Sequence, residues 1–142
     1  MIYLIRSHGK GESSLLKIGY TDSLKARNYS YIEHNPLIEI LGIREGDEEL
    51  ELTLQLRFSY HKAEILKEWF KDEEEIIKHF QDSLDNIDMW LWIHREDVFL
   101  ENTRSKKIKN IFKRIYYKYA PIDDPMYEGS DLENKLLRES PY

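Results

Sequence analysis

The amino-acid sequence predicts an α/β fold of the α+β type, in which a small antiparallel sheet of three strands is flanked by helices and followed by a helical extension. Three observations predict it. Two short apolar runs enclose a loop of turn-forming residues, a third β-rich run comes later, and several segments carry helical patterns. The expected order within the first 80 residues is strand, strand, helix, strand, helix, helix.

The first two strands are expected to form a hairpin. Residues 2–6 and 15–20 are the two apolar runs, and the residues between them are rich in glycine and serine, which favour turns. No basic leader precedes the first run and no small-residue cleavage site follows it, so we expect no secretory signal.

A helix, a third strand and another helix are expected next. Polar residues 21–23 suit the start of a helix over about residues 23–33, and Asn35-Pro36 ends it. Residues 37–44 are rich in β-branched and apolar side chains and predict the third strand. A helix is expected over residues 48–58, because the acids at its start suit the positive end of the helix dipole.

The remainder of the chain is expected to be mostly helical. Residues 67–70 suit a short extended piece, and Asp72 is expected to cap a helix that runs to Phe80. Residues 89–93 fit either a strand or a buried helical turn, and both interpretations stay open. Residues 106–119 place apolar side chains on one face and basic ones mostly opposite, which predicts an amphipathic helix.

The composition narrows the class of protein. A chain of 142 residues suits one domain with a short appendage. We expect no membrane partner, because no apolar run approaches the roughly 20 residues that span a bilayer. The absence of cysteine excludes disulfides, thiolate metal sites and a cysteine nucleophile, and it favours an intracellular location.

Charge is unevenly distributed along the sequence. The net charge is −6, which by itself argues against a nucleic-acid partner. However, residues 104–118 carry seven of the 21 basic residues and no acid. One strongly basic segment therefore lies within an acidic protein, and it suits phosphate contacts.

Several short motifs follow one another in the first 80 residues. They are Tyr3, Lys17-Ile18-Gly19-Tyr20-Thr21, Arg27, Asn35-Pro36, Glu51 to Phe58 and Glu68-Trp69-Phe70. In letters, spacing and order this pattern resembles the GIY-YIG nuclease superfamily, and in particular its phage-type subgroup. The chain departs from the family pattern at three positions: Met1 stands in place of a glycine, Lys17 in place of a tyrosine, and Gln55 in place of the histidine frequent in the subgroup.

The resemblance implies a metal-dependent DNA endonuclease that hydrolyses phosphodiester bonds. Such a reaction needs a deprotonated water, a cation beside the phosphate and usually a metal held by carboxylate. The family pattern implies that Tyr3 is the general base, and Lys17 on the paired strand is well placed to activate it. Arg27 and Tyr31, four residues apart, are expected to share a helix face and to clamp the phosphate. Glu51 would be the metal ligand, with Mg²⁺ or Mn²⁺ as the cofactor and no small-molecule cofactor.

Further substrate contacts are expected from residues outside this group. They are Gly19, His34, Lys106, Lys107, Lys109, Lys113 and Arg114. His34 has a second interpretation, in which it caps the end of the preceding helix. Taken singly, Tyr3 is an ordinary core residue and Arg27 an ordinary solvated side chain, so the functional hypothesis depends on the joint pattern.

The expected organisation is a GIY-YIG-like nuclease domain over residues 1–80, a helical and basic extension over residues 81–121, and a loosely ordered acidic tail over residues 122–142. Two alternatives stay open. The chain could be a catalytically inactive module with this fold that binds DNA or a protein. The basic helix could instead contact an acidic protein, or the acidic tail between residues 123 and 139.

Overall fold

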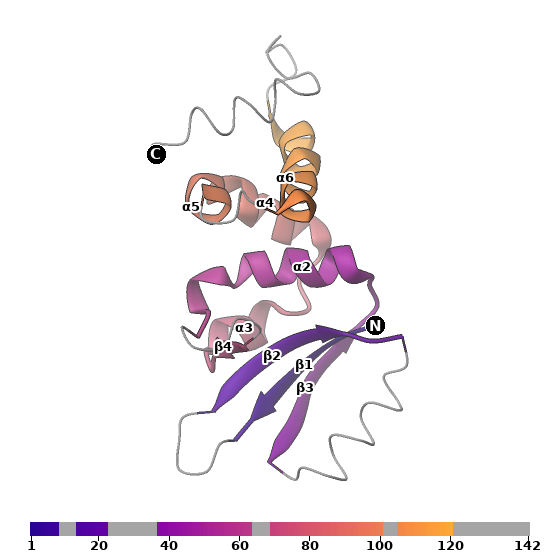
Figure 1. Cartoon of the computed structure of the whole chain (residues 1–142), viewed down its shortest axis with the longest axis vertical. Coiled ribbons are helices and arrows are strands. Elements are labelled where there is room, and N and C mark those ends of the chain that lie inside the picture. Colours follow the sequence, from indigo (N-terminus) through magenta and orange to yellow (C-terminus); the bar gives the residue numbers. More distant parts are fainter. Residues whose placement is uncertain (9–13, 23–36, 64–68, 101–104, 121–142) are drawn as a thin grey trace. The chain divides into compact units, whose positions relative to one another are not determined.

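The computed structural model describes residues 1–8, 14–22, 37–63, 69–100 and 105–120. The chain divides into two units, Met1–Asp82 and Ser83–Tyr142. The described part of the first unit combines a sheet with helices, and that of the second contains helices (Figure 1). The α+β class predicted from the sequence is confirmed.

The sheet of the first unit has four antiparallel strands in the order β3-β1-β2-β4. Strands β1 (Ile2–Ser7), β2 (Leu15–Tyr20) and β3 (Ile38–Arg44) confirm the three predicted strands. The prediction of a three-stranded sheet is nevertheless wrong, because β4 (Trp69–Lys71) pairs with the outer side of the hairpin. This strand lies in the segment that was expected to be only an extended piece.

Each face of the sheet has its own set of side chains. Leu4 pairs with Ile18, and Tyr3 pairs with Gly19. Because neighbouring residues on a strand point to opposite faces, Leu4 and Ile18 share one face and Tyr3 and Gly19 share the other. A register shift between Leu4 and Ile5 interrupts the pairing of β1 with β3.

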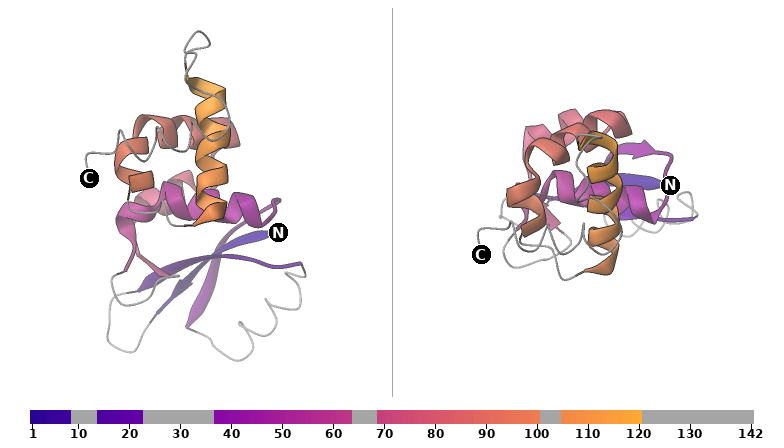
Figure 2. Two further views of the ribbon diagram at one scale, coloured as in Figure 1. Left: turned by 45° about the horizontal axis from the view of Figure 1, so that its top comes forward. Right: turned by 90° about the horizontal axis from the view of Figure 1, so that it is seen from above.

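Helix α2 (Glu48–Arg57) confirms the predicted second helix and packs against β2. Its first turn is capped by Asp47, whose Oδ1 accepts a hydrogen bond of 2.9 Å from the backbone N–H of Leu50. The acids that follow suit the positive end of the helix. Figures 1 and 2 show α2 running along one face of the sheet.

Helix α3 (Glu74–His79) begins later than expected, and Asp72 is not its cap. Its N-cap residue is Glu73, which makes no side-chain cap hydrogen bond. Asp72 instead binds the guanidinium of Arg6 on β1, which explains why the prediction of an Asp72 cap is wrong. The 3₁₀ helix η1 (Ser59–His61) connects α2 to the segment before β4.

The core of the first unit is made of apolar residues from the sheet, α2 and α3. Its fully buried members are Ile2, Leu4, Leu16, Ile18, Leu54, Phe58, Phe70, Ile76 and Phe80. Burial of one such side chain stabilises the fold by about 1.5–3 kcal/mol, so this layer fixes the position of the sheet. Gly42 on β3 is in contact with the Phe80 ring, and a Cβ there would lie 2.9 Å from Phe80 Cδ1.

The second unit contains α4 (Leu84–Ile93), α5 (Arg95–Leu100) and α6 (Lys106–Tyr119). The bounds of α6 confirm the predicted amphipathic helix. Residues 89–93, for which a strand or a helix was considered, belong to α4. The three helices pack on one another through Ile87, Leu91, Val98, Ile111 and Ile115, which are buried.

Some expectations fall outside the described residues. They are the helix over residues 23–33, its end at Asn35-Pro36 and the loose tail over residues 122–142. Within the described ranges, no helix combines the length and the apolar character needed to cross a membrane.

Candidate active site

Tyr3 and Gly19 face each other across the β1–β2 pair. The Tyr3 ring lies against Gly19 so closely that a Cβ at residue 19 would overlap Tyr3 Cζ and Oη. Only a residue without a side chain leaves room for the phenol at this place. Tyr3 is 3% exposed, so its hydroxyl is held in a defined and largely shielded position.

Lys17 lies on the same sheet face as Tyr3. It pairs with Ile5, and Ile5 is two residues from Tyr3 on β1, so Tyr3 and Lys17 are diagonal neighbours. Such neighbours have α-carbons about 7–8 Å apart and are within reach of long side chains. The hairpin therefore places the phenol and the ammonium group on one surface, as the sequence predicted.

Trp69 supports Lys17 from the next strand. The two residues pair across β2 and β4, and Lys17 Nζ lies 5.6 Å from the centroid of the Trp69 ring. A cation above an aromatic face is attracted by the ring quadrupole, by about 0.5–1 kcal/mol where the site is open. The sequence did not indicate this contact, because it depends on the pairing of β4.

The surroundings of Tyr3 on this face are apolar. Tyr3 and Ile5 form a buried cluster, against which Met1, Ile38, Ile40 and Trp69 pack. Charges act over longer distances in such surroundings than in water, because the local dielectric is low. Lys17 borders this apolar cluster through its contact with the Trp69 ring.

The side chain of Glu51, on helix α2, is held in place by Gln55 on the same helix. Gln55 Nε2 donates hydrogen bonds of 3.2 Å to Glu51 Oε1 and of 3.2 Å to the backbone carbonyl of Ile18. Ile18 is the neighbour of Gly19, so the carboxylate is tied to β2 next to the residue that contacts the Tyr3 phenol. Gln55, which stands where the subgroup frequently has histidine, thus connects Glu51 to the sheet.

Three of the expected site residues lie outside the described ranges. They are Arg27, Tyr31 and His34. The structure therefore brings Tyr3, Lys17 and Gly19 onto one face and ties Glu51 to the adjoining residue of β2. The phosphate clamp expected from Arg27 and Tyr31 stays a prediction.

A charged cluster fixes the opposite end of β1. Arg6 Nε donates to Asp72 Oδ2 at 2.8 Å, and Arg6 Nη1 donates to Glu39 Oε1 at 2.7 Å. Burial alone raises the pKa of Asp72, but hydrogen bonds from Ser14 and Arg6 outweigh it, so the pKa lies below its ordinary value. This cluster joins β1, β3 and the segment after β4, and its role is structural.

A second charged group joins α2 to α3. Glu75 accepts a hydrogen bond of 3.2 Å from Arg57 Nη1, and His61 Nε2 lies 2.6 Å from Glu75 Oε2. The contact with His61, followed by that with Arg57, lowers the pKa of Glu75. Arg57 is itself buried, so this contact supplies a negative charge where the core holds a positive one.

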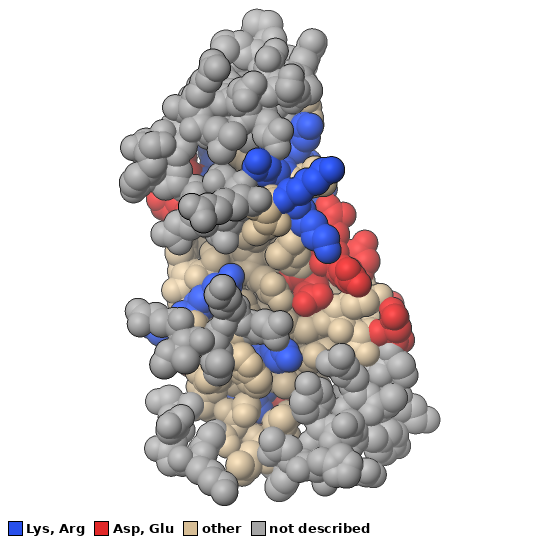
Figure 3. Space-filling model, viewed as in Figure 1, with Lys and Arg blue, Asp and Glu red and all other residues tan. Residues whose placement is uncertain are grey.

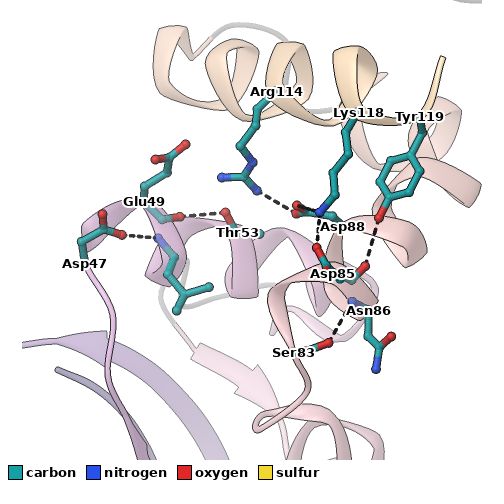
Figure 4. A network of polar contacts seen from close by, with 11 residues as sticks. Asp47, Glu49, Thr53, Ser83, Asp85, Asn86, Asp88, Arg114, Lys118 and Tyr119 are labelled. Carbon is teal, nitrogen blue, oxygen red and sulfur yellow. Dashed lines mark hydrogen bonds and ion pairs between the residues drawn. The ribbon is translucent and has the colours of Figure 1, made fainter. Parts of the chain in front are cut away.

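The basic side chains of α6 differ in their contacts and in their exposure. Arg114 Nη2 donates to Asp88 Oδ1 at 2.7 Å, and Lys118 contacts Asp85 and Asp88 (Figure 4). The others are Lys106 and Lys107, which are exposed, and Lys109 and Lys113, which are half-buried. Figure 3 shows Lys and Arg side chains gathered over α6.

A metal would have to be held with few protein ligands. Within the described ranges, no group of three or more His, Asp or Glu side chains is placed to bind a metal ion. Mg²⁺ usually keeps several waters and is bound by one or two carboxylates together with substrate phosphates. The single carboxylate of Glu51, with its orientation fixed by Gln55, fits this type of binding.

Comparison with known proteins adds no assignment. No protein-family model, no curated protein and no solved structure matches this chain.

Proposed function

We propose that residues 1–80 form a GIY-YIG-type, Mg²⁺-dependent endonuclease domain that hydrolyses phosphodiester bonds in DNA. The observation that carries the proposal is the contact between Tyr3 and Gly19, with Lys17 on the same face of the hairpin. A general base needs a fixed position, and a tyrosine needs a nearby positive charge to lose its proton. The contact with Gly19 supports the fixed position of Tyr3, and Lys17 on the same face is proposed to supply the charge.

In this mechanism Tyr3 Oη, in its deprotonated form, accepts a proton from the attacking water. The water oxygen then bonds to phosphorus while the sugar oxygen on the opposite side leaves. Lys17 stabilises the negative charge of the phenolate, since it lies diagonally across the strand pair. Arg27 is proposed to bind the phosphate oxygens as charge develops on them.

Glu51 would hold the metal ion. Gln55 orients this carboxylate through a hydrogen bond to Oε1, and the carboxylate would supply an oxygen ligand for the ion. Bound Mg²⁺ would neutralise part of the negative charge that develops on the phosphate. Glu51 is therefore proposed to contribute to charge stabilisation and Tyr3 to proton transfer. Substitutions of these two residues should impair cleavage in different ways.

The test is incubation of the purified full chain with supercoiled plasmid and Mg²⁺ or Mn²⁺, with EDTA as the metal-free reference. We expect the wild-type protein to nick or linearise the plasmid. Tyr3→Phe keeps the ring and should lower the rate by about 10²-fold to 10⁴-fold. Glu51→Gln should abolish cleavage and retain DNA binding, because only the negative charge is lost.

Matched controls are available on the same elements. Tyr20→Phe removes a hydroxyl from the strand paired with β1, and Glu48→Gln removes an exposed charge from the first turn of α2. Both should cleave at about the wild-type rate. Wild-type cleavage by Tyr3→Phe together with Glu51→Gln would contradict the proposed mechanism.

The burial of Tyr3 favours a second candidate, a module of the same fold that binds DNA or a protein without cleaving it. A hydroxyl on a residue that is 3% exposed has little access to bulk water. Binding of DNA with no cleavage in any divalent metal would support this candidate. The same result would exclude the endonuclease.

A further inference from the structure

The second unit holds helix α6 in a fixed orientation. Ile111 and Ile115 are buried on the side of α6 that packs against α4 and α5. The Phe112 ring packs against Phe99 of α5, with ring centroids 4.0 Å apart, and the Tyr116 ring meets Trp92 of α4 edge-on, with centroids 5.6 Å apart. One side of α6 is thus fully occupied by the core of its own unit.

A buried charge network fixes the rotation of the helix about its axis. Asp88 on α4 is 1% exposed and accepts hydrogen bonds from Arg114 and Lys118 (Figure 4). Tyr119 Oη donates to the backbone carbonyl of Asp85 at 3.1 Å. A rotation of α6 would separate these charges and leave Asp88 buried without a partner, which is energetically costly.

The side of α6 that faces away from the core of its unit is polar and basic. Residues spaced by three or four positions share a helix face, and Lys106, Asn110, Lys113 and Tyr117 follow that spacing. We call these four residues, with the adjoining Lys107, the α6 ridge. Lys106, Lys107, Asn110 and Tyr117 are exposed, and Lys113 is half-buried.

We propose that the α6 ridge docks in the major groove of duplex DNA. The charge supports this partner, because α6 carries no acid while the whole chain has a net charge of −6. An α-helix with its side chains is about 10–12 Å across, which matches the width of the major groove of about 12 Å.

The arrangement of the ridge fits this mode of binding. Lys106, Lys107 and Lys113 can contact phosphates on the groove walls, as basic side chains do in most DNA interfaces. Asn110 lies at the centre of the exposed face, where a side-chain amide can pair with the edge of an adenine. The fixed orientation of α6 means that little order has to be gained on binding.

The inference is independent of the chemistry proposed for residues 1–80, because docking needs neither the metal nor Tyr3. The test therefore measures binding of the full chain in EDTA, by fluorescence anisotropy of a labelled DNA duplex at several salt concentrations. Each neutralised phosphate contributes about −0.9 to the slope of log K against log salt. We expect Lys106→Glu, Lys107→Glu and Lys113→Glu combined to flatten that slope by about 2 to 3.

The control variant combines Lys62→Glu, Lys71→Glu and Lys78→Glu, which changes the net charge equally at exposed lysines of the first unit. It should leave the slope close to that of the wild type. Fraying at the start of α6 does not explain weak binding by the ridge variant, because acids at positions 106 and 107 in its first turn favour the helix. Equal slopes in the ridge variant and the wild type would overturn the proposal and favour an acidic protein partner.

A second arm identifies the groove. Methyl green occupies the major groove and distamycin the minor groove, so each competes with a ligand of its own groove. We expect methyl green to displace the wild-type protein and distamycin to leave it bound. Displacement by distamycin alone would overturn docking in the major groove.

Discussion

The phenol ring of Tyr3 occupies the space in which any side chain at Gly19 would have to lie. The two residues face each other in the β1–β2 pair, so backbone register and side-chain packing specify the same contact. Glycine is therefore required at this position because there is no room for a side chain. This steric requirement can be tested separately from catalysis.

Gly19→Ala should destabilise the first unit by about 1–3 kcal/mol, the usual cost of inserting a methyl group into a packed site. The added Cβ would overlap Tyr3 Cζ and Oη, so the ring must move. The free energy of unfolding from urea titration measures the effect.

The double variant Gly19→Ala with Tyr3→Ala is the control for this prediction. Removing the ring removes the overlap, so the combined loss should be smaller than the two single losses added together. Strict additivity would show that the methyl group disturbs β2 by some other route.

Gln55→Leu should weaken metal binding without unfolding the helix. Leucine has a similar volume and a good helix propensity, but it cannot donate hydrogen bonds to Glu51 and to the carbonyl of Ile18. Loss of a neighbouring residue that orients a metal ligand lowers metal affinity by about 10-fold to 100-fold. Titration of cleavage rate against Mg²⁺ concentration gives the shift in the midpoint.

Gln55→His, which introduces the residue frequent in the phage-type subgroup that the sequence resembles, is the informative companion. A histidine can donate one hydrogen bond to Glu51, so we expect an intermediate midpoint. An unchanged midpoint in Gln55→Leu would show that Glu51 does not need this support.

Asp72→Asn should remove part of the acid sensitivity of the fold. Hydrogen bonds from Ser14 and Arg6 hold the pKa of Asp72 below its ordinary value of 3.8, so its contribution is present above that value and is lost as pH falls through the folded pKa. The variant should be less stable by about 1 kcal/mol near neutral pH and similar to the wild type at about pH 2.

Urea unfolding at several pH values between these limits measures the difference. Glu73→Gln removes an exposed neighbouring carboxylate and serves as the control. Its unfolding curve should follow the wild-type pH dependence. A constant difference between Asp72→Asn and the wild type at every pH would contradict the assigned role of the carboxylate.

Asp88→Ala should loosen the second unit. It leaves Arg114 without its 2.7 Å partner and removes one of the two carboxylates near Lys118. Both cations are partly exposed, so we expect a loss of about 1–3 kcal/mol, below the full cost of breaking a buried pair. Amide hydrogen exchange in α4 and α6 measures the loss within this unit.

Asp85→Ala is the matched change on the same helix. The Asp85 side chain is 79% exposed, so its removal should cost less than about 1 kcal/mol. Equal protection losses in the two variants would show that the burial of Asp88 is unimportant.

The sequence predicted those elements that carry a strong local signal. The spans of β2 and α6 agree with the structure at both ends, since the apolar run of residues 15–20 after a turn-rich loop and the amphipathic pattern of residues 106–119 are such signals. The start of α2 was also predicted from local sequence, because acids suit the positive end of a helix dipole.

The elements that were missed depend on contacts between distant residues. Strand β4 has three residues, too few for a period, and forms because β2 offers it a partner. Helix α4 is apolar over much of its surface, so it shows little of the contrast that marks a helix in sequence. The carboxylate of Asp72 bonds to a strand 66 residues earlier, which local capping rules do not anticipate.

In the candidate site, too, some contacts follow from local sequence signals and others depend on residues distant in the sequence. The hairpin pairing of Tyr3 with Gly19 could be anticipated from two apolar runs and their loop. The contact of Lys17 with Trp69 could not be, because it needs the register of a fourth strand. The bond between Gln55 and Glu51 had a usable signal, since residues four apart on a helix are neighbours.

The register shift between β1 and β3 determines where β3 can lose a residue. Leu4 pairs with Gly42 and Ile5 with Ile40, so Leu41 is the extra residue of the bulge. Deleting Leu41 would give a regular ladder and keep every other side chain on its present face. Deleting a residue farther along β3 would turn over the side chains between the deletion and the bulge. A one-residue deletion therefore disturbs the fewest side chains of β3 when it falls at the bulge.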